Sequence, residues 1–214
     1  MILLTSAKMP EGLDKNTLAS AVSLMFPSPE NRDFIERMRE KTLESSACES
    51  LFALTLLYEQ IRDLPQTHGD TKDLVFLRNP MGKPYFKDSD IRFNVSHSKG
   101  FVVCAAAVGE ELGVDVEASL ITPERAERLS KRYFSEEEQT EISKHPEIFA
   151  RKWTEKEARA KFSGESIEKI LSQDKISPFS EIKSSIRLHR YTFEEHPVTL
   201  CTKRDFSTII YTVQ

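Results

Sequence analysis

The spacing of apolar residues predicts one long amphipathic helix in the first half of the chain. Between Ser45 and Leu64, apolar side chains recur at intervals of three and four residues, which places them on one helical face. They are Ala47, Leu51, Leu54, Tyr58 and Ile61. Ser46 and Glu49 have the spacing of a capping box at the start of this helix, and Pro65 ends it. We expect the helix to pack against a core and to carry no chemistry.

Alternating apolar and polar positions predict strands in the middle of the chain. Residues 91–96 alternate as in a strand with one buried face. Residues 101–108 are apolar throughout, which is typical of a central strand buried on both faces. A tight turn at Gly109 leads into a strand over residues 112–117, so these last two strands are predicted to pair as a hairpin. Residues 1–30 carry little signal.

Helix signals dominate the next segment, and strands return at the end of the chain. One helix is expected to begin at Thr122 as its N-cap, and a second at Ser135, where Glu138 completes a capping box. A third is expected over residues 146–162, with Gly164 as its C-terminal stop. Strands are expected over residues 186–193, 198–203 and 207–213. These elements predict an α+β fold.

Composition limits the classes of protein to which the chain can belong. Its 214 residues suffice for one domain or two small lobes, and 39% apolar with 30% charged residues is an ordinary globular composition. A net charge of −4 gives no overall basic field, so we expect no nucleic-acid partner. The longest uncharged run, residues 100–109, is too short to span a membrane. Three widely spaced cysteines and a start that lacks a signal-peptide pattern predict a cytoplasmic protein without disulfides or a zinc site.

The first candidate for chemistry is the acidic pair Asp115 and Glu117 in a Gly-Val-Asp-Val-Glu strand. Alternate residues of a strand point to the same face, so the two carboxylates lie side by side while Val114 and Val116 face the core. Like charges this close favour a cation between them, and Mg²⁺ takes one or two carboxylates together with substrate phosphates. The alternative is a solvated strand edge.

A second candidate lies on the third predicted helix, where Glu157 and Lys161 are four residues apart on one face. Trp153 shares that face one turn earlier, which would place the charged pair at the border of a cleft. The alternative is a surface ion pair with Trp153 in the core. Glu138 has a sufficient role as a helix cap, and a place at the border of the site is its alternative.

A third candidate is the segment Ser96-His97-Ser98. Strand alternation puts Ser96 and Ser98 on one face and His97 on the other, whereas a strand that ends at Ser96 would let all three project together. A histidine beside serines and a lysine can hold a phosphate, and a structural histidine is the alternative. Lys83, in a Gly-Lys-Pro loop, is either a phosphate contact or solvated.

Taken together and in this order, the motifs resemble those of 4'-phosphopantetheinyl transferases, in their larger, surfactin-synthetase-activating class. The matching motifs are Gly82-Lys83-Pro84, Phe93–Ser98, Gly113–Glu117, Arg132–Glu138 and Trp153–Lys161. The resemblance covers residues 82–167. Its most specific part is the order and spacing of the two motifs that carry Asp115, Glu117 and Glu157.

The resemblance implies a pseudo-dimer of two similar α/β lobes, each an antiparallel sheet packed with helices, with the active site between them. We expect the first lobe over residues 1–111 and the second, which carries the carboxylates, over residues 112–214. The implied reaction moves phosphopantetheine from coenzyme A to a serine of an apo acyl or peptidyl carrier protein and releases adenosine 3',5'-bisphosphate. A two-lobed chain of this kind would act as a monomer without a membrane.

The resemblance also assigns roles to single residues. Asp115, Glu117 and Glu157 would hold Mg²⁺, and Lys161 would contact the pyrophosphate of coenzyme A. His97 with Ser96 would contact its 3'-phosphate, and Lys83 would lie near the nucleotide. These residues are Lys83, Ser96, His97, Asp115, Glu117, Glu157 and Lys161. A base must take the serine proton, and either Glu157 or a metal-bound hydroxide would serve.

Two features of the chain depart from the family pattern. The first third lacks the arginine-rich pattern that is common in the family, so only Lys41 or Arg39 suggest themselves as nucleotide contacts there. A serine, Ser166, replaces the second of two glycines that often follow the position of Lys161. Two other readings remain open at this point. One is a different Mg²⁺-dependent enzyme acting on phosphate esters, and the other is a non-catalytic module that binds carrier proteins.

Overall fold

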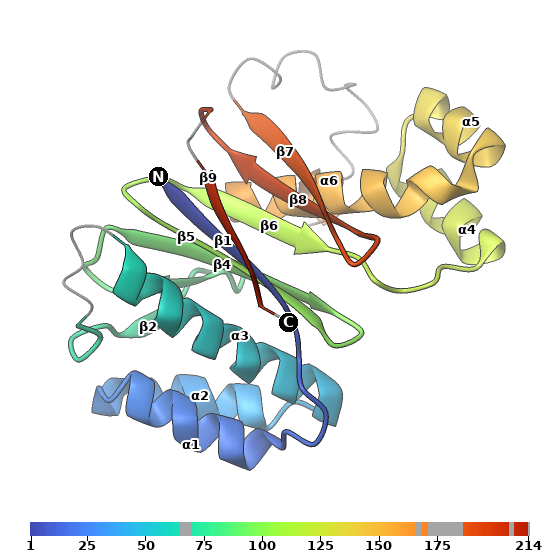
Figure 1. The fold of residues 1–214 in the computed structure, drawn as a ribbon. Coiled ribbons are helices and arrows are strands. Elements are labelled where there is room, and N and C mark those ends of the chain that lie inside the picture. Colours follow the sequence, from blue (N-terminus) through green and yellow to red (C-terminus); the bar gives the residue numbers. More distant parts are fainter. Residues whose placement is uncertain (65–69, 166–167, 171–185, 206–207, 214) are drawn as a thin grey trace.

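Two larger β-sheets, a small two-stranded sheet and six α-helices lie in the part of the chain that the computed structural model describes, residues 1–64, 70–165, 168–170, 186–205 and 208–213 (Figure 1). The first sheet has the strand order β4-β5-β1-β9, and the second has the order β6-β8-β7. The strands of the first sheet are β1 (Ile2–Lys8), β4 (Ile91–Ser98), β5 (Phe101–Val108) and β9 (Thr208–Val213). Those of the second are β6 (Leu112–Val116), β7 (Arg187–Phe193) and β8 (His196–Thr202).

The helices flank the two sheets. Three of them lie on one side of the first sheet, with α3 against it and α1 and α2 beyond (Figure 1). These are α1 (Lys15–Met25), α2 (Arg32–Arg39) and α3 (Glu44–Asp63), and a small hairpin of β2 (Phe76–Arg78) and β3 (Pro84–Phe86) lies nearby. The long helix α6 packs against β6 and β8 of the second sheet. It spans Phe149–Ser163 and is preceded by α4 (Pro123–Tyr133) and α5 (Glu136–Lys144).

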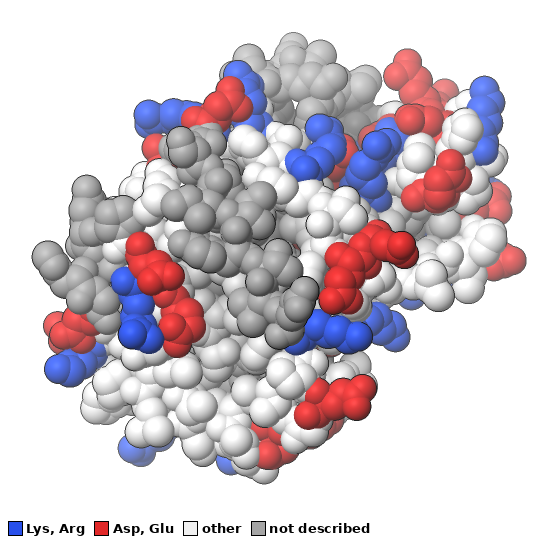
Figure 2. All heavy atoms as spheres, viewed as in Figure 1, with Lys and Arg blue, Asp and Glu red and all other residues white. Residues whose placement is uncertain are grey.

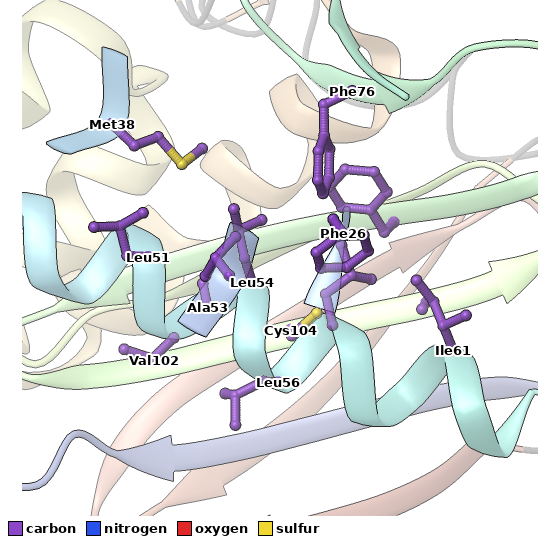
Figure 3. Close-up of a cluster of buried hydrophobic side chains, with 14 of the residues drawn as sticks. Phe26, Met38, Leu51, Ala53, Leu54, Leu56, Ile61, Phe76, Val102 and Cys104 are labelled. Atoms are coloured by element: carbon purple, nitrogen blue, oxygen red, sulfur yellow. The ribbon is translucent and has the colours of Figure 1, made fainter. Parts of the chain in front are cut away.

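Strand β5 is the centre of the packing because both of its faces are buried. Val102, Cys104 and Ala106 pack into one core cluster with α3 and the aromatic residues around it (Figure 3). Val103 and Ala105 pack into a second cluster with residues of β6 and β8. Each fully buried aliphatic side chain contributes about 1.5–3 kcal/mol. The prediction of a central strand over residues 101–108 is therefore confirmed.

The capping box predicted for the first long helix is wrong. Helix α3 begins at Glu44, its N-cap is Leu43, and no side chain caps it. Ser46 and Glu49 therefore lie inside the helix. The Glu49 carboxylate instead contacts His97 on β4, so a tertiary contact replaces the local one. The helix itself is confirmed, and the prediction that Pro65 ends it lies outside the described residues.

The predicted hairpin of residues 101–108 and 112–117 is also wrong. The turn at Gly109 has the positive φ of 73° that a tight turn requires, but β6 pairs with β8 and belongs to the second sheet. On its other edge, the backbone of β6 bonds to side chains of β4. The short turn therefore moves the chain from one sheet to the next, and β5 pairs with β1 and β4.

The predicted α+β class is confirmed, with every described strand pair antiparallel except β1 and β9, which run parallel. Each half of the chain contains a long helix packed on a sheet, α3 in the first and α6 in the second. The last strand, β9, pairs with β1 and so returns to the first sheet. The relation of the halves as a pseudo-dimer, and a boundary between residues 111 and 112, stay predictions.

Local signals explain most of the helix ends. Thr122 caps α4 by accepting a bond from the Arg125 N–H, and Ser135 forms the predicted capping box with Glu138. Gly164 ends α6 in the left-handed conformation, at a φ of 66°. The third predicted helix starts later than expected, because residues 146–148 form a separate 3-10 turn. The sequence patterns missed α1, which Asp14 caps, and α2.

The surface charges, the helices and the cysteines of the described residues agree with the globular composition of the chain. On the face drawn in Figure 2, acidic and basic side chains are interspersed over the described residues. No described helix combines the length and the apolar character that a membrane span requires. All three cysteines, Cys48, Cys104 and Cys201, are buried as free thiols.

Candidate active site

Polar side chains of β4 join the two sheets along a seam between β4 and β6. Three alternate side chains of β4 accept hydrogen bonds from three alternate backbone N–H groups in and just after β6. The pairs are Asn94 with Val114 (2.8 Å), Ser96 with Val116 (3.4 Å) and Ser98 with Ala118 (3.1 Å). The side-chain period of two in β4 therefore matches the backbone period of two in β6. This pairing fixes the register in which the candidate residues of the two strands meet.

The same serines contact the acidic pair. Ser96 Oγ donates to Asp115 Oδ1 at 2.7 Å, and Ser98 Oγ donates to Glu117 Oε1 at 2.9 Å. Glu117 Oε1 also accepts a bond of 2.8 Å from the Ser119 N–H. Asp115 is only 3% exposed, so the reading of this pair as a solvated strand edge is wrong for Asp115. The carboxylates lie at the seam, with Val114 and Val116 buried in the core as predicted.

Helix α6 brings a cation into this acidic seam. Lys161 Nζ lies 2.6 Å from Asp115 Oδ1, 2.9 Å from Ser96 Oγ and 3.9 Å from Glu157 Oε2. The helix approaches this closely because Gly113 has no side chain. A Cβ at Gly113 would lie 2.2 Å from the Ala158 carbonyl oxygen. Glu157 and Lys161 are thus part of a tertiary cluster, and the surface ion-pair reading is wrong.

The acidic groups at the seam are electrostatically crowded. Burial first, and the charge of Asp115 second, raise the pKa of Glu157 to about 7. Burial also raises the pKa of Asp115, against the opposing effect of Lys161. A carboxyl group whose pKa lies near neutrality can take up or release a proton under ordinary conditions. The cluster therefore has both a candidate base and a strong demand for positive charge.

The donor set fits a hard divalent cation. The charge of Glu117 raises the pKa of Asp115 and of Glu157, as a carboxylate does when it shares a site with others. Carboxylate oxygens are the protein ligands that Mg²⁺ prefers. Among the described residues, no three acidic, histidine or cysteine side chains are gathered at metal-binding distances. The Lys161 ammonium is the cation that contacts Asp115 in this arrangement.

Comparison with known proteins identifies the family. A profile of the 4'-phosphopantetheinyl transferase superfamily matches residues 111–209, which include the strand and helix that carry the carboxylates. The chain is 33% identical over 140 residues to the 4'-phosphopantetheinyl transferase AcpT of Escherichia coli strain K12, and the match covers 62% of this chain and 68% of AcpT. The chain belongs to the 4'-phosphopantetheinyl transferase superfamily.

Two further relatives extend the similarity within this superfamily. The 4'-phosphopantetheinyl transferase Sfp of Bacillus subtilis strain 168 is 28% identical over 171 residues, 77% of this chain and 72% of Sfp. A putative 4'-phosphopantetheinyl transferase of Synechocystis, slr0495, is 33% identical over 126 residues, 55% of this chain. The matched stretch spans about half the length of slr0495, 48%. The family predicted from the motifs is confirmed, and the match to Sfp supports its larger, surfactin-synthetase-activating type.

In this superfamily member, Ser96 and His97 face opposite sides of β4. Ser96 is committed to Asp115 and Lys161 at the seam. His97 contacts Glu49 and Ser50 of α3 instead. The strand continues to Ser98, so the alternation that separates the two residues is confirmed. A joint contact of Ser96 and His97 with one phosphate stays a prediction.

The Lys83 side chain contacts acceptors of the same chain. Its ammonium contacts Glu111 Oε2 at 2.9 Å, the Leu112 carbonyl at 3.1 Å and the Phe162 carbonyl at 3.4 Å. These three acceptors match the three hydrogens of an ammonium group. A cavity of about 640 Å³ lies beside Lys83, and its lining includes Arg92 but none of the three carboxylates. A nucleotide contact of Lys83 stays a prediction.

The remaining motif residues have structural contacts. Trp153 packs in a core cluster with Phe149, where the two rings stack with centroids 5.9 Å apart. Glu138 completes the capping box and its Oε2 also lies 3.1 Å from Lys156 Nζ. Lys156 is only 4% exposed and lies over the Phe134 ring. The core reading of Trp153 and the capping role of Glu138 are confirmed.

Glu49 is a polar residue that the sequence patterns assigned to the wrong role. Its partner, His97, is far away in the chain, so no local spacing relates the two residues. The only signal was an acidic side chain inside the apolar stretch of a predicted core helix, which demands a buried partner.

Proposed function

We propose that this chain transfers the 4'-phosphopantetheine group from coenzyme A to a serine hydroxyl of an apo acyl or peptidyl carrier protein, with Mg²⁺. The observation that carries the proposal is the cluster of Asp115, Glu157 and Lys161 at the seam. In the transfer, a bond forms between the serine oxygen and the β-phosphorus. The bond between that phosphorus and the bridging oxygen of the pyrophosphate breaks. The bridging oxygen leaves with adenosine 3',5'-bisphosphate, and a base takes the serine proton. Such reactions depend on positioning and charge neutralisation more than on covalent help.

Three carboxylates would hold the metal ion, namely Asp115, Glu117 and Glu157. When bound, Mg²⁺ would neutralise the pyrophosphate and polarise the bond that breaks. Ser96 and Ser98 support the proposal because each fixes one carboxylate of the pair by a hydrogen bond. Such supporting bonds keep ligand oxygens aimed at one point.

Lys161 is proposed to contact the pyrophosphate. Its ammonium already lies between Asp115 and Glu157, and its side chain is 23% exposed, so it can turn from the carboxylates toward an incoming anion. A lysine in that position stabilises the charge that develops on the leaving phosphate.

Glu157 is proposed to take the serine proton. In the metal-free protein its pKa is about 7, so this carboxylate can take up or release a proton near neutral pH. The carboxylate lies on the exposed side of the cluster, with 20% of its side chain accessible, whereas Asp115 is 4% accessible. A hydroxyl group from a partner protein can therefore reach Glu157 more easily than Asp115.

Coenzyme A is the proposed donor, and four residues are proposed for its nucleotide half. His97 and Lys41 would contact the 3'-phosphate, because both lie near Ser50 Oγ on the α3 side of β4. Lys83 would lie near the nucleotide, beside the cavity of about 640 Å³. The family resemblance also assigns Ser96 to the 3'-phosphate, and the Ser96 hydroxyl would act from the seam.

The proposal includes the oligomeric state and the cellular location of the protein. Ser96 and Asp115 approach across the seam, and Lys161 of the same chain completes the cluster, which supports action as a monomer. Three free thiols fit the reducing cytoplasm.

A labelling assay tests the proposed function. The protein is incubated with Mg²⁺, fluorescently labelled coenzyme A and a panel of apo carrier proteins, and the carriers are separated by gel electrophoresis. Wild type should label at least one carrier, and the Glu157→Gln variant should lose most of that label while remaining folded. Phosphate release from coenzyme A without a carrier would instead indicate a different Mg²⁺-dependent enzyme. Carrier binding without label would indicate a binding module.

A further inference from the structure

A second polar cluster lies on the face of β4 opposite the carboxylates, where His97 meets the first turns of α3. His97 Nδ1 lies 2.7 Å from Glu49 Oε2, and Nε2 lies 3.1 Å from Ser50 Oγ. Glu49 Oε1 accepts a bond of 2.6 Å from the Gly100 N–H in the turn between β4 and β5. Glu49 is 6% exposed, so both of its oxygens are engaged and shielded from water.

The hydrogen bonds define which nitrogens of His97 carry protons. A carboxylate accepts only, so Nδ1 donates to Glu49. Ser50 Oγ gives its single hydrogen to the Ser46 carbonyl at 2.7 Å, and it accepts one from Lys41 Nζ at 2.5 Å. The lone pair that remains on Ser50 faces Nε2, so Nε2 donates as well. A ring that donates from both nitrogens carries a positive charge.

The Glu49 carboxylate is suited to hold this charge. Burial opposes its ionisation, but the hydrogen bonds from His97 and from the Gly100 N–H outweigh burial, so the pKa of Glu49 lies below its ordinary value. The negative charge lies on the Nδ1 side of the ring. The Nε2 side of the ring faces Ser50 Oγ, which the Lys41 ammonium also contacts.

Lys41 supplies a second cation at the same point. Its ammonium and His97 Nε2 both lie within 3.1 Å of Ser50 Oγ. Burial first, and Arg78 second, lower the pKa of Lys41, and Arg37 acts on Arg78 in the same way. In the described ranges, no carboxylate lies within ion-pair distance, 4.0 Å, of Lys41, Arg78 or Arg37. Glu49 is the carboxylate whose charge acts on Lys41, and it is already bonded to His97 and to the Gly100 N–H. Cations that crowd together with so little acidic compensation favour a polyvalent anion, and a phosphate monoester has the matching double charge.

We propose that Glu49 is the positioning residue for recognition of the donor's 3'-phosphate by His97. Glu49 holds the ring through Nδ1 and aims Nε2–H at the point that the Lys41 ammonium also reaches. This inference rests on the proposed function, in which the donor is coenzyme A. Without the Glu49 carboxylate, the ring would lose its contact at Nδ1 and would be free to turn away from Lys41.

The test compares coenzyme A with dephospho-coenzyme A, which lacks the 3'-phosphate, in the Mg²⁺-dependent transfer assay. Glu49→Gln keeps the size of the side chain and removes its charge. The KM for coenzyme A should rise about tenfold, the value of one hydrogen bond to a charged group. The kcat and the KM for dephospho-coenzyme A should stay unchanged. In a His97→Gln background, Glu49→Gln should have no further effect on the KM for coenzyme A.

A control variant separates positioning from loss of stability. Glu138→Gln also removes a carboxylate from a lysine contact, and it lies outside both clusters. It should lower the melting temperature and leave the preference for coenzyme A over dephospho-coenzyme A as in wild type. An equal change of both KM values in Glu49→Gln would overturn the inference, because a purely structural role affects both donors alike. A wild-type enzyme without preference between the donors would overturn it too.

Binding without catalysis tests the inference separately from the proposed function. Calorimetry with adenosine 3',5'-bisphosphate and with AMP, without metal or carrier, should give tighter binding of the bisphosphate by wild type. Glu49→Gln should remove about tenfold of that difference. A failure of transfer by wild type would defeat the proposed function, whereas equal binding of the two nucleotides by wild type would defeat the role of Glu49.

Discussion

Ser96 Oγ donates a hydrogen bond of 2.7 Å to Asp115 Oδ1 across the seam between the two sheets. The same oxygen accepts from the Val116 N–H and from Lys161 Nζ, so one hydroxyl joins a strand of each sheet to the helix behind them. A residue that the family resemblance assigned to the nucleotide therefore also organises the acidic cluster.

Ser96→Ala should destabilise the protein by about 1–3 kcal/mol, because the buried Asp115 carboxylate keeps its contact with Lys161 but loses the hydroxyl donor, and the Val116 N–H loses its acceptor. Denaturant unfolding checks this change. Ser98→Ala is the matched control, since its hydroxyl makes the equivalent contacts at the more exposed end of the seam, and it should cost less. An equal cost for both variants would contradict the organising role of Ser96.

Gly113→Ala should be far more damaging than its single added carbon suggests. The new Cβ would meet the backbone of α6 at Ala158 and Phe162, at 2.2 and 2.3 Å, and backbone cannot move aside. We expect a loss of about 3 kcal/mol or more. Gly109→Ala is the control, because its Cβ would meet nothing within 4 Å and its cost of about 1–2 kcal/mol comes only from the positive φ. Thermal unfolding of the two variants gives the comparison, and similar melting temperatures would contradict the tight approach of α6 to β6.

Lys161→Ala should destabilise the metal-free protein. It leaves the buried Asp115 carboxylate without its closest cation, which costs about 3 kcal/mol. Added Mg²⁺ should therefore raise the melting temperature of the variant more than that of wild type, because the metal can replace the missing ammonium. Differential scanning fluorimetry with chelator and with Mg²⁺ measures both effects. An equal response of variant and wild type would show that Lys161 and the metal do not share the site.

Stability without metal should depend on pH through Glu157. The folded state raises the pKa of Glu157 from 4.5 to about 7, so between these values the folded protein binds a proton that the unfolded chain releases. The contribution of Glu157 is complete below about pH 4.5 and is lost as the pH rises through about 7. In chelator, Glu157→Gln should remove this part of the decline and be more stable than wild type at pH 8.

The matched control for this pH dependence is Glu155→Gln, on the same helix. The Glu155 carboxylate binds Arg190 Nε at 2.7 Å, away from the cluster. This variant should keep the wild-type decline between pH 5 and pH 8, which unfolding curves at several pH values would record. The same decline in Glu157→Gln would mean that another group titrates.

Glu138→Gln should lower stability without changing transfer. The variant loses the charged contact with the buried Lys156, at a cost of about 1–3 kcal/mol. Its carboxylate also completes the capping box of α5, so two structural contacts weaken together. Thermal unfolding and the transfer rate at a permissive temperature check the two parts. A lost transfer rate in a folded variant would place Glu138 at the site.

The parts of the fold that could be predicted from sequence are those that depend on residues close together in the chain. Strand alternation assigned Ser96 and His97 to opposite faces of β4, and the capping residue Ser135 marked the start of α5. The pairing of β6 with β8 was not accessible, because Asp115 lies opposite Thr199, which is distant in the chain. A short turn at Gly109 normally signals a hairpin, and only the competing side chains of β4 show why it does not form one here.

The candidate site shows the same division between local and distant information. The motifs named Asp115, Glu157 and Lys161 because their spacing within one strand and one helix is local. The Lys83 ammonium donates to the carbonyls of Leu112 and Phe162, which lie 29 and 79 residues away in the chain. Sequence alone therefore could not decide whether Lys83 is solvated or contacts a phosphate. Glu49 had the spacing of a capping box with Ser46, and this local pattern concealed the tertiary contact with His97.

Intact-protein mass spectrometry measures the proposed transfer and its metal dependence in one experiment. Apo carrier proteins from fatty-acid, polyketide and peptide systems are incubated with the protein and coenzyme A, with Mg²⁺ or with chelator. At least one carrier should gain the mass of one phosphopantetheine with Mg²⁺, and none should gain it with chelator. If no carrier gained that mass, or if the gain persisted unchanged in chelator, the proposed Mg²⁺-dependent transfer would be wrong.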